Sequence, residues 1–272
     1  MSYEARIVLD SVGPWGDRLV TMLLTYPRII HSELMTHRVF SRNAESSRAI
    51  PVKERIARVL ADPFIPESFG RNQRGMQAAA PLTDADASYA RLLWTDALQA
   101  AIQAAQAMAD LEVHKQLANR LLEPFSWITV LVSSTAWGCG GMPGNFMALR
   151  NNPLAQPEFQ RIARMTKDAI EASEPTLLAE GKWHLPFITD EDRAQTTQRT
   201  AIQVSVARCA RLSYLTHEGV RDLSKDIELY ERLAGADPPH ASAFEHVARP
   251  GMDRALTGNF VRWEQYRCVV GF

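Results

Sequence analysis

The stretch MTHRVFSRNAESSRAIP, from Met35 to Pro51, gathers many hydrogen-bond donors into one short segment of a nearly neutral chain. Its only acid is Glu45. Arginine forks and serine hydroxyls bind phosphate oxygens, and the backbone N–H groups of a loop add further donors. The segment is therefore either a phosphate or nucleotide site or a solvated polar loop. The candidate donors are His37, Arg38, Ser41, Arg42, Asn43, Ser46, Ser47 and Arg48.

The totals exclude some classes of protein. The chain has 272 residues, of which 46% are hydrophobic, enough for one large domain or two small ones with a buried core. Lysine and arginine number 30 against 31 aspartate and glutamate residues, so the net charge is -1. A general nucleic-acid binder usually carries a strong positive excess, and we therefore expect no nucleic-acid partner.

The sequence also indicates a compartment. No apolar run is long enough to cross a bilayer, and the opening residues MSYEARIVLDSVG lack a signal pattern. Three cysteines without CxxC spacing (Cys139, Cys209 and Cys268) argue against a disulfide framework and a zinc ribbon. We therefore expect a cytoplasmic protein with no membrane partner.

Apolar periodicity predicts a single, helix-rich α+β domain over residues 1–272. Strands are expected at 5–12 and 17–27, and the segment 126–135 is either a strand or a buried helix. The donor-rich stretch, 64–83 and 138–145 are expected to be loops. Helices are expected at 28–37, 52–62, 84–122 with a break near Asp110, 146–152, 157–173, 189–214 and 223–235.

Two clusters invite a catalytic interpretation that the residues support weakly. His240, Glu245 and His246 suggest a metal, but the spacing is not HExxH and no third ligand is evident, so we expect no metal site. Cys139 lies among glycines and is either a nucleophile or a small residue in a tight loop. A thiolate nucleophile needs an electropositive pocket and a base, and the local sequence shows neither.

Two further segments are polar in a way that fits ligand recognition. Arg120 lies on an expected helix, where a salt-bridged surface is the simpler interpretation. Asn145, Arg150 and Gln156 interrupt the apolar run NFMALRNNPLAQPEF, a pattern that also fits recognition of a flat polar ring.

Taken together, these segments resemble the flavin-dependent thymidylate synthases, which carry the motif RHRxxSxNExSxRY. The stretch THRVFSRNAESSRA, residues 36–49, is similar to that motif, as NFMALRNNPLAQPEF is to the family's NFxxLR…AQxEI and NRLLEP to its arginine-bearing helix. ARLSYLTHEGVRDLSKDIELYERLAGADPPHASAFEH is similar to the family's ARVSY…HxxPFEH segment. The motif matches fall at His37, Arg38, Ser41, Asn43, Ser46 and Arg48.

In the usual family order the ARVSY…HxxPFEH segment precedes the RHR motif. In this sequence the corresponding segment follows the motif. The resemblance therefore implies a circularly permuted, phage-type variant of the family's α+β fold, helix-rich with a small mixed or antiparallel sheet. A permutation of this kind is physically cheap where the termini lie close together at the surface.

The resemblance implies a reductive methylation. The family methylates dUMP at C5 to give dTMP, with methylenetetrahydrofolate as carbon donor, FAD as hydride carrier and NADPH as reductant. It also implies a homotetramer whose active sites are shared between subunits. Two alternatives remain: a related flavoenzyme that hydroxymethylates a pyrimidine nucleotide or methylates UMP, and a nucleotide-binding paralogue without flavin chemistry.

Family roles carry over position by position. Arg150 would lie against the uracil as the catalytic residue, because a guanidinium stabilises negative charge on the ring. The residues implied for dUMP binding are Glu33, Ser46, Ser47, Arg48, Arg120 and Arg150. The residues implied for FAD binding are His37, Arg38, Ser41, Asn43, Asn145, Gln156, Ser213, Ser242 and Glu245.

The sequence departs from the family pattern mainly at positions that serve flavin. Thr36 replaces an arginine, Ala44 a glutamate and Leu154 a histidine, although Glu45 lies next to Ala44. The loop GCGGMPG, residues 138–144, replaces an Asn-Ala-Arg element. Either the cofactor is held differently or the chemistry has shifted.

Overall fold

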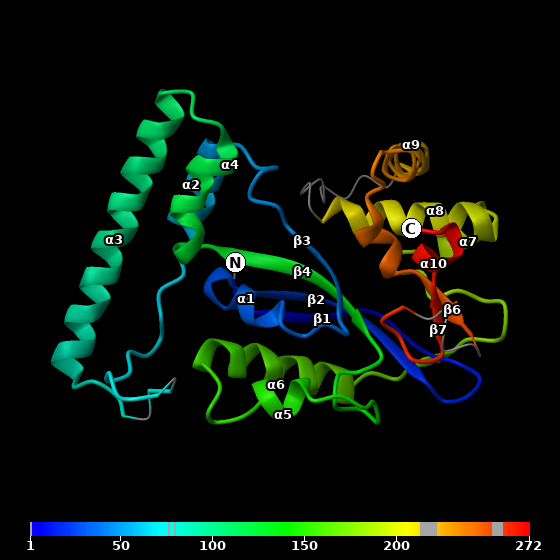
Figure 1. Ribbon diagram of the computed structural model, residues 1–272, viewed down its shortest axis with the longest axis horizontal. Coiled ribbons are helices and arrows are strands. Elements are labelled where there is room, and N and C mark those ends of the chain that lie inside the picture. The colour runs from blue at the N-terminus through cyan, green and yellow to red at the C-terminus, as the bar shows by residue number, and fades with distance from the viewer. Residues whose placement is uncertain (1, 76, 79, 213–221, 252–257) are drawn as a thin grey trace.

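A mixed sheet lies at the centre of the structure. The structure is a computed structural model, and it describes residues 2–75, 77–78, 80–212, 222–251 and 258–272. The strands are β1 (Glu4–Val12), β2 (Arg18–Pro27), β3 (Ser41–Ala44), β4 (Trp127–Ser134) and β5 (Thr176–Leu177). Their order is β3-β4-β2-β1-β5, with β5 parallel to β1 and the other pairs antiparallel (Figure 1). The α+β class expected from the sequence is confirmed, and the segment 126–135 is a strand.

The two faces of the sheet are covered by different parts of the chain. Met22 and Val132 point to one face, where α5 (Phe146–Arg150) and α6 (Pro157–Glu171) lie. Leu23 and Leu131 point to the other face and pack with the C-terminal half of the chain. Successive residues of a strand point to opposite faces, so β2, buried along nearly its whole length, is apolar on both.

A third group of helices forms its own small core beside the sheet (Figure 1). Leu98 of the long helix packs with Ile56 and Phe125. Glu112 has a φ of 58°, so the predicted break near Asp110 is confirmed. The members are α2 (Val52–Ala61), α3 (Asp84–Asp110), α4 (Lys115–Ala118) and the 3-10 helix η2 (Asn119–Phe125).

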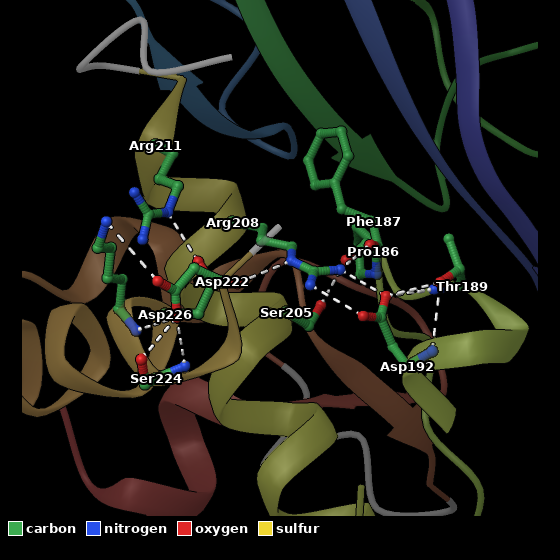
Figure 2. Close-up of polar contacts among 11 residues, drawn as sticks. Pro186, Phe187, Thr189, Asp192, Ser205, Arg208, Arg211, Asp222, Ser224 and Asp226 are labelled. Atoms are coloured by element: carbon green, nitrogen blue, oxygen red, sulfur yellow. Dashed lines mark hydrogen bonds and ion pairs between the residues drawn. The ribbon is translucent and has the colours of Figure 1, made fainter. Parts of the chain in front are cut away.

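The C-terminal half folds over the second face of the sheet. Its elements are α7 (Asp190–Gln195), α8 (Gln198–Arg211), α9 (Leu223–Ala234), η3 (Ala241–Glu245), β6 (Ala248–Pro250), β7 (Trp263–Gln265) and α10 (Tyr266–Val270). β6 and β7 form a separate antiparallel pair. Figure 2 shows Arg208 of α8 between two carboxylates, with Nη1 2.6 Å from Asp192 of α7 and Nε 3.0 Å from Asp226 of α9. This buried network joins the three helices.

Two predictions of local structure are wrong. The donor-rich stretch is not a loop throughout, because Ser41–Ala44 forms the edge strand β3 against β4. The helix expected at 189–214 is two helices, since Thr196 is extended and the Thr197 side chain caps α8 by accepting from the Thr200 N–H. The 3-10 helix η1 (Arg28–Ile30) and α1 (His31–Leu34) cover residues 28–34 of the helix expected at 28–37, which ends three residues early.

Candidate functional site

Arg150, the last residue of α5, is the centre of a polar cluster at the end of α1. Its Nη1 pairs with the carboxylate of Glu33, and its Nε donates to Nε2 of His37 at 3.0 Å. Its Nη2 lies 3.3 Å from the hydroxyl of Thr36. The guanidinium also stands over the ring of Phe159, 4.7 Å from its centre. The structure therefore brings together Glu33 and Arg150, which were expected to bind the nucleotide, and His37, which was expected to bind flavin.

His37 is neutral at pH 7. Burial lowers its pKa to about 4, with the positive charges of Arg150 and Arg42 adding to the effect. Because Arg150 can only donate, Nε2 of His37 is the acceptor and Nδ1 carries the proton. The ring is held between Phe40, stacked at 5.6 Å, and Phe146, edge-on at 5.0 Å. His37 thus fixes the orientation of Arg150 without adding a second charge.

Arg42 holds the turn that carries His37, a role that sequence analysis did not assign. Its Nη1 donates to the carbonyl oxygens of Leu34, Met35 and His37 at 3.2, 3.0 and 3.1 Å. These carbonyls follow the end of α1, where helix geometry leaves acceptors without intrahelical partners. The sequence contained a hint of this role, because an arginine shortly after the end of a helix often donates to the last helical carbonyl oxygens.

Ser41 and Asn43, expected to bind flavin, are buried and bond within the chain. The Ser41 hydroxyl accepts from Nε2 of Gln265 at 2.9 Å, and the Asn43 amide donates to the carbonyl of Cys209 at 2.6 Å. The same Gln265 amide donates to the carbonyl of Glu245 at 2.7 Å, and the Glu245 carboxylate pairs with Arg267. The motif strand and the HASAFEH segment are therefore neighbours, although they lie far apart in sequence.

The segment from Ser46 to Ile50 is held against the helical group. Asn119 donates to the carbonyl oxygens of Ser47 and Ile50 at 2.7 and 2.9 Å, and Lys115 donates to that of Ala49 at 3.0 Å. This places the exposed Arg48 beside the helices that carry Arg120, which follows Asn119 directly and is also exposed. Sequence analysis did not single out Asn119 or Lys115.

Glu45, which lies next to Ala44 in the donor-rich stretch, pairs with two arginines of α2. It is buried and lies 3.2 Å from Nη2 of Arg55 and 3.3 Å from Nη1 of Arg58, both on α2. These three side chains line a cavity of about 150 Å³ with Trp127. Glu45 thus serves the contact between the motif and α2.

The remaining expected residues lie at the surface. Arg38, Asn145, Gln156 and Ser242 are exposed, and Ser213 lies outside the described residues. Leu154 is also exposed. Asn145 begins α5 and Gln156 begins α6, in each case without a side-chain capping bond.

The glycines of the loop 138–144 serve its own conformation. Gly144 has a φ of 121°, and a Cβ there would lie 2.2 Å from the carbonyl oxygen of Ala136. Gly138 has a φ of 76° and a Cβ there would meet the Gly144 carbonyl at 2.7 Å. Backbone crowding at positive φ requires glycine, which accounts for the composition of this loop.

The other chemical candidates are engaged elsewhere. Cys139 is buried, which raises its thiol pKa to about 11, so the nucleophilic thiolate is scarce at pH 7. His246 is buried and bonds to the Ser133 hydroxyl. Over the described ranges, no group of three or more His, Cys, Asp or Glu side chains is placed to hold a metal. Within the same ranges no helix has both the length and the apolar character needed to span a bilayer.

No protein-family model matches the sequence, and no curated protein matches it. Among the solved structures similar to the chain are two of the UMP/dUMP methylase PolB from Streptomyces cacaoi. The complex with 5-Br UMP is 17% identical over 63% of this chain and 94% of the other, with a TM-score of 0.49. The complex with 5-Br dUMP is 19% identical over 57% of this chain and 71% of the other, with a TM-score of 0.43. Likenesses of this size are too slight to indicate a shared activity.

Proposed function

We propose that this chain binds a pyrimidine nucleoside monophosphate, with dUMP as substrate, and methylates C5 of its ring in a flavin-dependent reaction. The observation that carries the proposal is the setting of Arg150. Its guanidinium is oriented by Glu33 and a neutral His37, at the start of the segment that also carries Arg48. That arrangement offers a fixed positive charge for a ring and further donors for a phosphate.

Arg150 would act on the pyrimidine electrostatically. Its side chain is 17% exposed and that of Glu33 is 33% exposed, so a ring can reach both from solvent. Uracil oxygens would compete with Glu33 for the guanidinium, and negative charge on the ring would be stabilised there. Such charge makes C5 nucleophilic without a cysteine, in keeping with the raised thiol pKa of Cys139.

Arg48 and Arg120 would bind the phosphate, with the hydroxyls of Ser46 and Ser47 as lesser partners. Both arginines are exposed, and Arg120 pairs with Glu123, at 2.9 Å on the same helix. Exposed guanidinium groups can bind phosphate oxygens in pairs. Because Asn119 and Lys115 hold the intervening backbone, Arg48 would meet its ligand from an ordered segment.

The exposed polar residues fit a flavin. Arg38, Asn145, Gln156 and Ser242 offer a guanidinium, two amides and a hydroxyl, which suit a diphosphate, a ring edge and a ribityl chain. When bound, reduced FAD would supply the hydride, with methylenetetrahydrofolate as carbon donor and NADPH as reductant. The internally bonded Ser41 and Asn43 would hold the strand rather than contact the cofactor.

A permuted order of the family's segments is part of the proposal. It is supported by Gln265, which bonds to both Ser41 of the motif strand and the Glu245 carbonyl. The two segments thus lie together although their order is reversed. A homotetramer with shared sites is also part of the proposal.

Purified protein tests the proposal. We expect bound or added FAD to give a flavin absorption spectrum, and dUMP with methylenetetrahydrofolate and NADPH to yield dTMP by mass spectrometry. UMP and dUMP are compared in the same assay, because a single hydroxyl separates them. Nucleotide binding without flavin would favour the binding paralogue, and a hydroxymethyl product would favour the related flavoenzyme. Binding of neither nucleotide would reject the proposal.

A further inference from the structure

Five polar side chains form a continuous buried chain on the face of the sheet that carries the C-terminal half. Ser11, Thr21 and Ser133 come from β1, β2 and β4, and His184 and His246 come from the covering segments. Each of the five is at most 1% exposed. Hydroxyl and imidazole groups at such depth need internal partners, because an unmade hydrogen bond there is costly.

The hydrogen bonds run without a gap from one end to the other. Ser11 Oγ lies 2.8 Å from His184 Nδ1, and His184 Nε2 lies 2.8 Å from Thr21 Oγ1. Thr21 Oγ1 lies 2.6 Å from Ser133 Oγ, which lies 2.9 Å from His246 Nδ1. The far nitrogen of the last ring, His246 Nε2, is buried and has no partner among the described residues.

Both rings are neutral at pH 7. Burial lowers the pKa of His184 to about 3, with His246 and Arg193 as lesser causes, and burial lowers that of His246 to about 3. A neutral imidazole has one N–H donor and one acceptor nitrogen, and a hydroxyl has one hydrogen. If every hydrogen in the middle of the chain is used, all bonds point the same way. His184 and His246 must then have the same tautomer.

We propose that His184 is a positioning residue for His246, and that the hydroxyls of Thr21 and Ser133 transmit its tautomer, so that the two rings carry their proton on the same nitrogen. A proton on Nδ1 of both rings leaves the Ser11 hydroxyl hydrogen without an acceptor among the described residues, and a proton on Nε2 of both leaves the His246 N–H without one. The geometry therefore fixes the relation between the two tautomers, whichever end of the chain carries the spare hydrogen.

The inference does not depend on the proposed function, because tautomers are read on the purified chain without nucleotide or flavin. Two-bond proton–nitrogen spectra of protein with 15N-labelled histidine, at pH 7, distinguish Nδ1–H from Nε2–H. We expect the same tautomer for His184 and His246. Opposite tautomers would overturn the proposal.

Breaking the chain at its middle tests the transmission. Thr21→Val removes a hydroxyl that does not touch His246, and we expect it to shift the His246 Nδ1 resonance through Ser133. Thr21→Ser keeps the hydroxyl and should restore the original position. Thr25→Val is the matched control, because Thr25 and Thr129 form a similar cross-strand hydroxyl pair at 2.9 Å.

We expect the shift caused by Thr21→Val to be several-fold larger than that caused by Thr25→Val. Equal shifts, or no rescue by Thr21→Ser, would show that the effect is structural and that His246 is not coupled to the chain. If Thr21→Val fails to fold, Ser11→Ala removes the hydroxyl at the other end of the chain, which bonds to His184 and does not touch His246. The wild-type tautomers decide the proposal without any variant.

Discussion

At the scale of single residues, the geometry of Arg150 depends on its planar fork. Nε serves His37 while Nη1 serves Glu33, and a lysine has one nitrogen that cannot do both. We expect Arg150→Lys to keep any bound flavin but to lower kcat for dUMP methylation by about 100-fold or more, as when an oriented donor is removed. Steady-state kinetics and the flavin spectrum measure the two effects.

Arg164→Lys is the matched control for that change, because Arg164 is an exposed arginine on α6. It should leave kcat unchanged. Turnover of Arg150→Lys at the level of this control would remove Arg150 from the reaction.

The neutral state of His37 predicts a dependence of stability on pH. Its pKa is lowered to about 4 in the folded protein from an ordinary 6.5, so the unfolded chain binds the proton more readily between those values. The contribution is therefore fully present above pH 6.5 and is lost as pH falls toward 4. By linkage, the full shift corresponds to about 3 kcal/mol of unfolding free energy.

His37→Gln checks this prediction, because glutamine can accept from Arg150 but does not titrate. Urea unfolding at pH 7 and pH 4.5 should show a smaller loss of stability in the variant than in the original protein. His240→Gln, at an exposed histidine, should leave the pH dependence as it was. If His37→Gln loses as much unfolding free energy between pH 7 and pH 4.5 as the original protein, His37 does not titrate between these pH values.

At this same scale, sequence reasoning named some residues that the structure brings together and misjudged the environment of others. His37 and Arg150 could be named because motif spacing is local to each segment, and the two are in contact. The internal bonding of Ser41 and Asn43 could not be foreseen, since their partners Gln265 and Cys209 lie 224 and 166 positions away in sequence. Whether a polar side chain faces a ligand or the chain itself is a tertiary fact.

At the scale of elements, the contact among α7, α8 and α9 depends on Arg208. The Asp192 carboxylate bonds to this guanidinium and to the Thr189 cap, which together hold the pKa of Asp192 well below its usual range (Figure 2). We expect Asp192→Asn to lower the free energy of unfolding by about 3–5 kcal/mol, because a buried arginine loses a charged partner. Chemical unfolding at pH 7 measures the loss.

Glu4→Gln is the control for that variant, since Glu4 pairs with Arg6 at the surface and should matter much less. The direction in which stability changes with pH also follows from Asp192. The depressed pKa of Asp192 gives stability that is present above its unfolded value of 3.8 and is lost as pH falls below it. Equal losses in the two variants would show that the buried network is not what joins these helices.

Elements with a strong apolar pattern could be predicted from the sequence. The two wrong predictions of local structure fall where the apolar pattern is weak. β2 is a continuous, largely apolar run and α6 has a clear helical periodicity, and both were expected. β3 is SRNA, without an apolar alternation, and it exists because the edge of β4 offers backbone partners. The break between α7 and α8 lies in a threonine pair whose capping role competes with a helix that composition alone would continue.

At the scale of the whole molecule, the proposed ring and phosphate groups come from different parts of the fold. Arg150 ends α5, which covers one face of the sheet, whereas Arg120 lies in η2, within the helical group beside the sheet (Figure 1). The proposed homotetramer with shared sites would combine these groups from two copies.

Mixing two inactive variants tests this arrangement. Arg150→Ala should lack ring activation and Arg48→Ala should lack phosphate binding, so each alone should be nearly inactive on dUMP. If each site combines Arg150 of one copy with Arg48 of another, random reassociation leaves about one site in four with both arginines intact. We therefore expect mixed subunits, unfolded and refolded together, to regain about a quarter of the original activity. Variants refolded separately and then combined without exchange are the control, and they should remain inactive. If co-refolding restores no activity while mass measurement shows mixed assemblies, both arginines serve a site within one chain, and the shared-site arrangement is wrong.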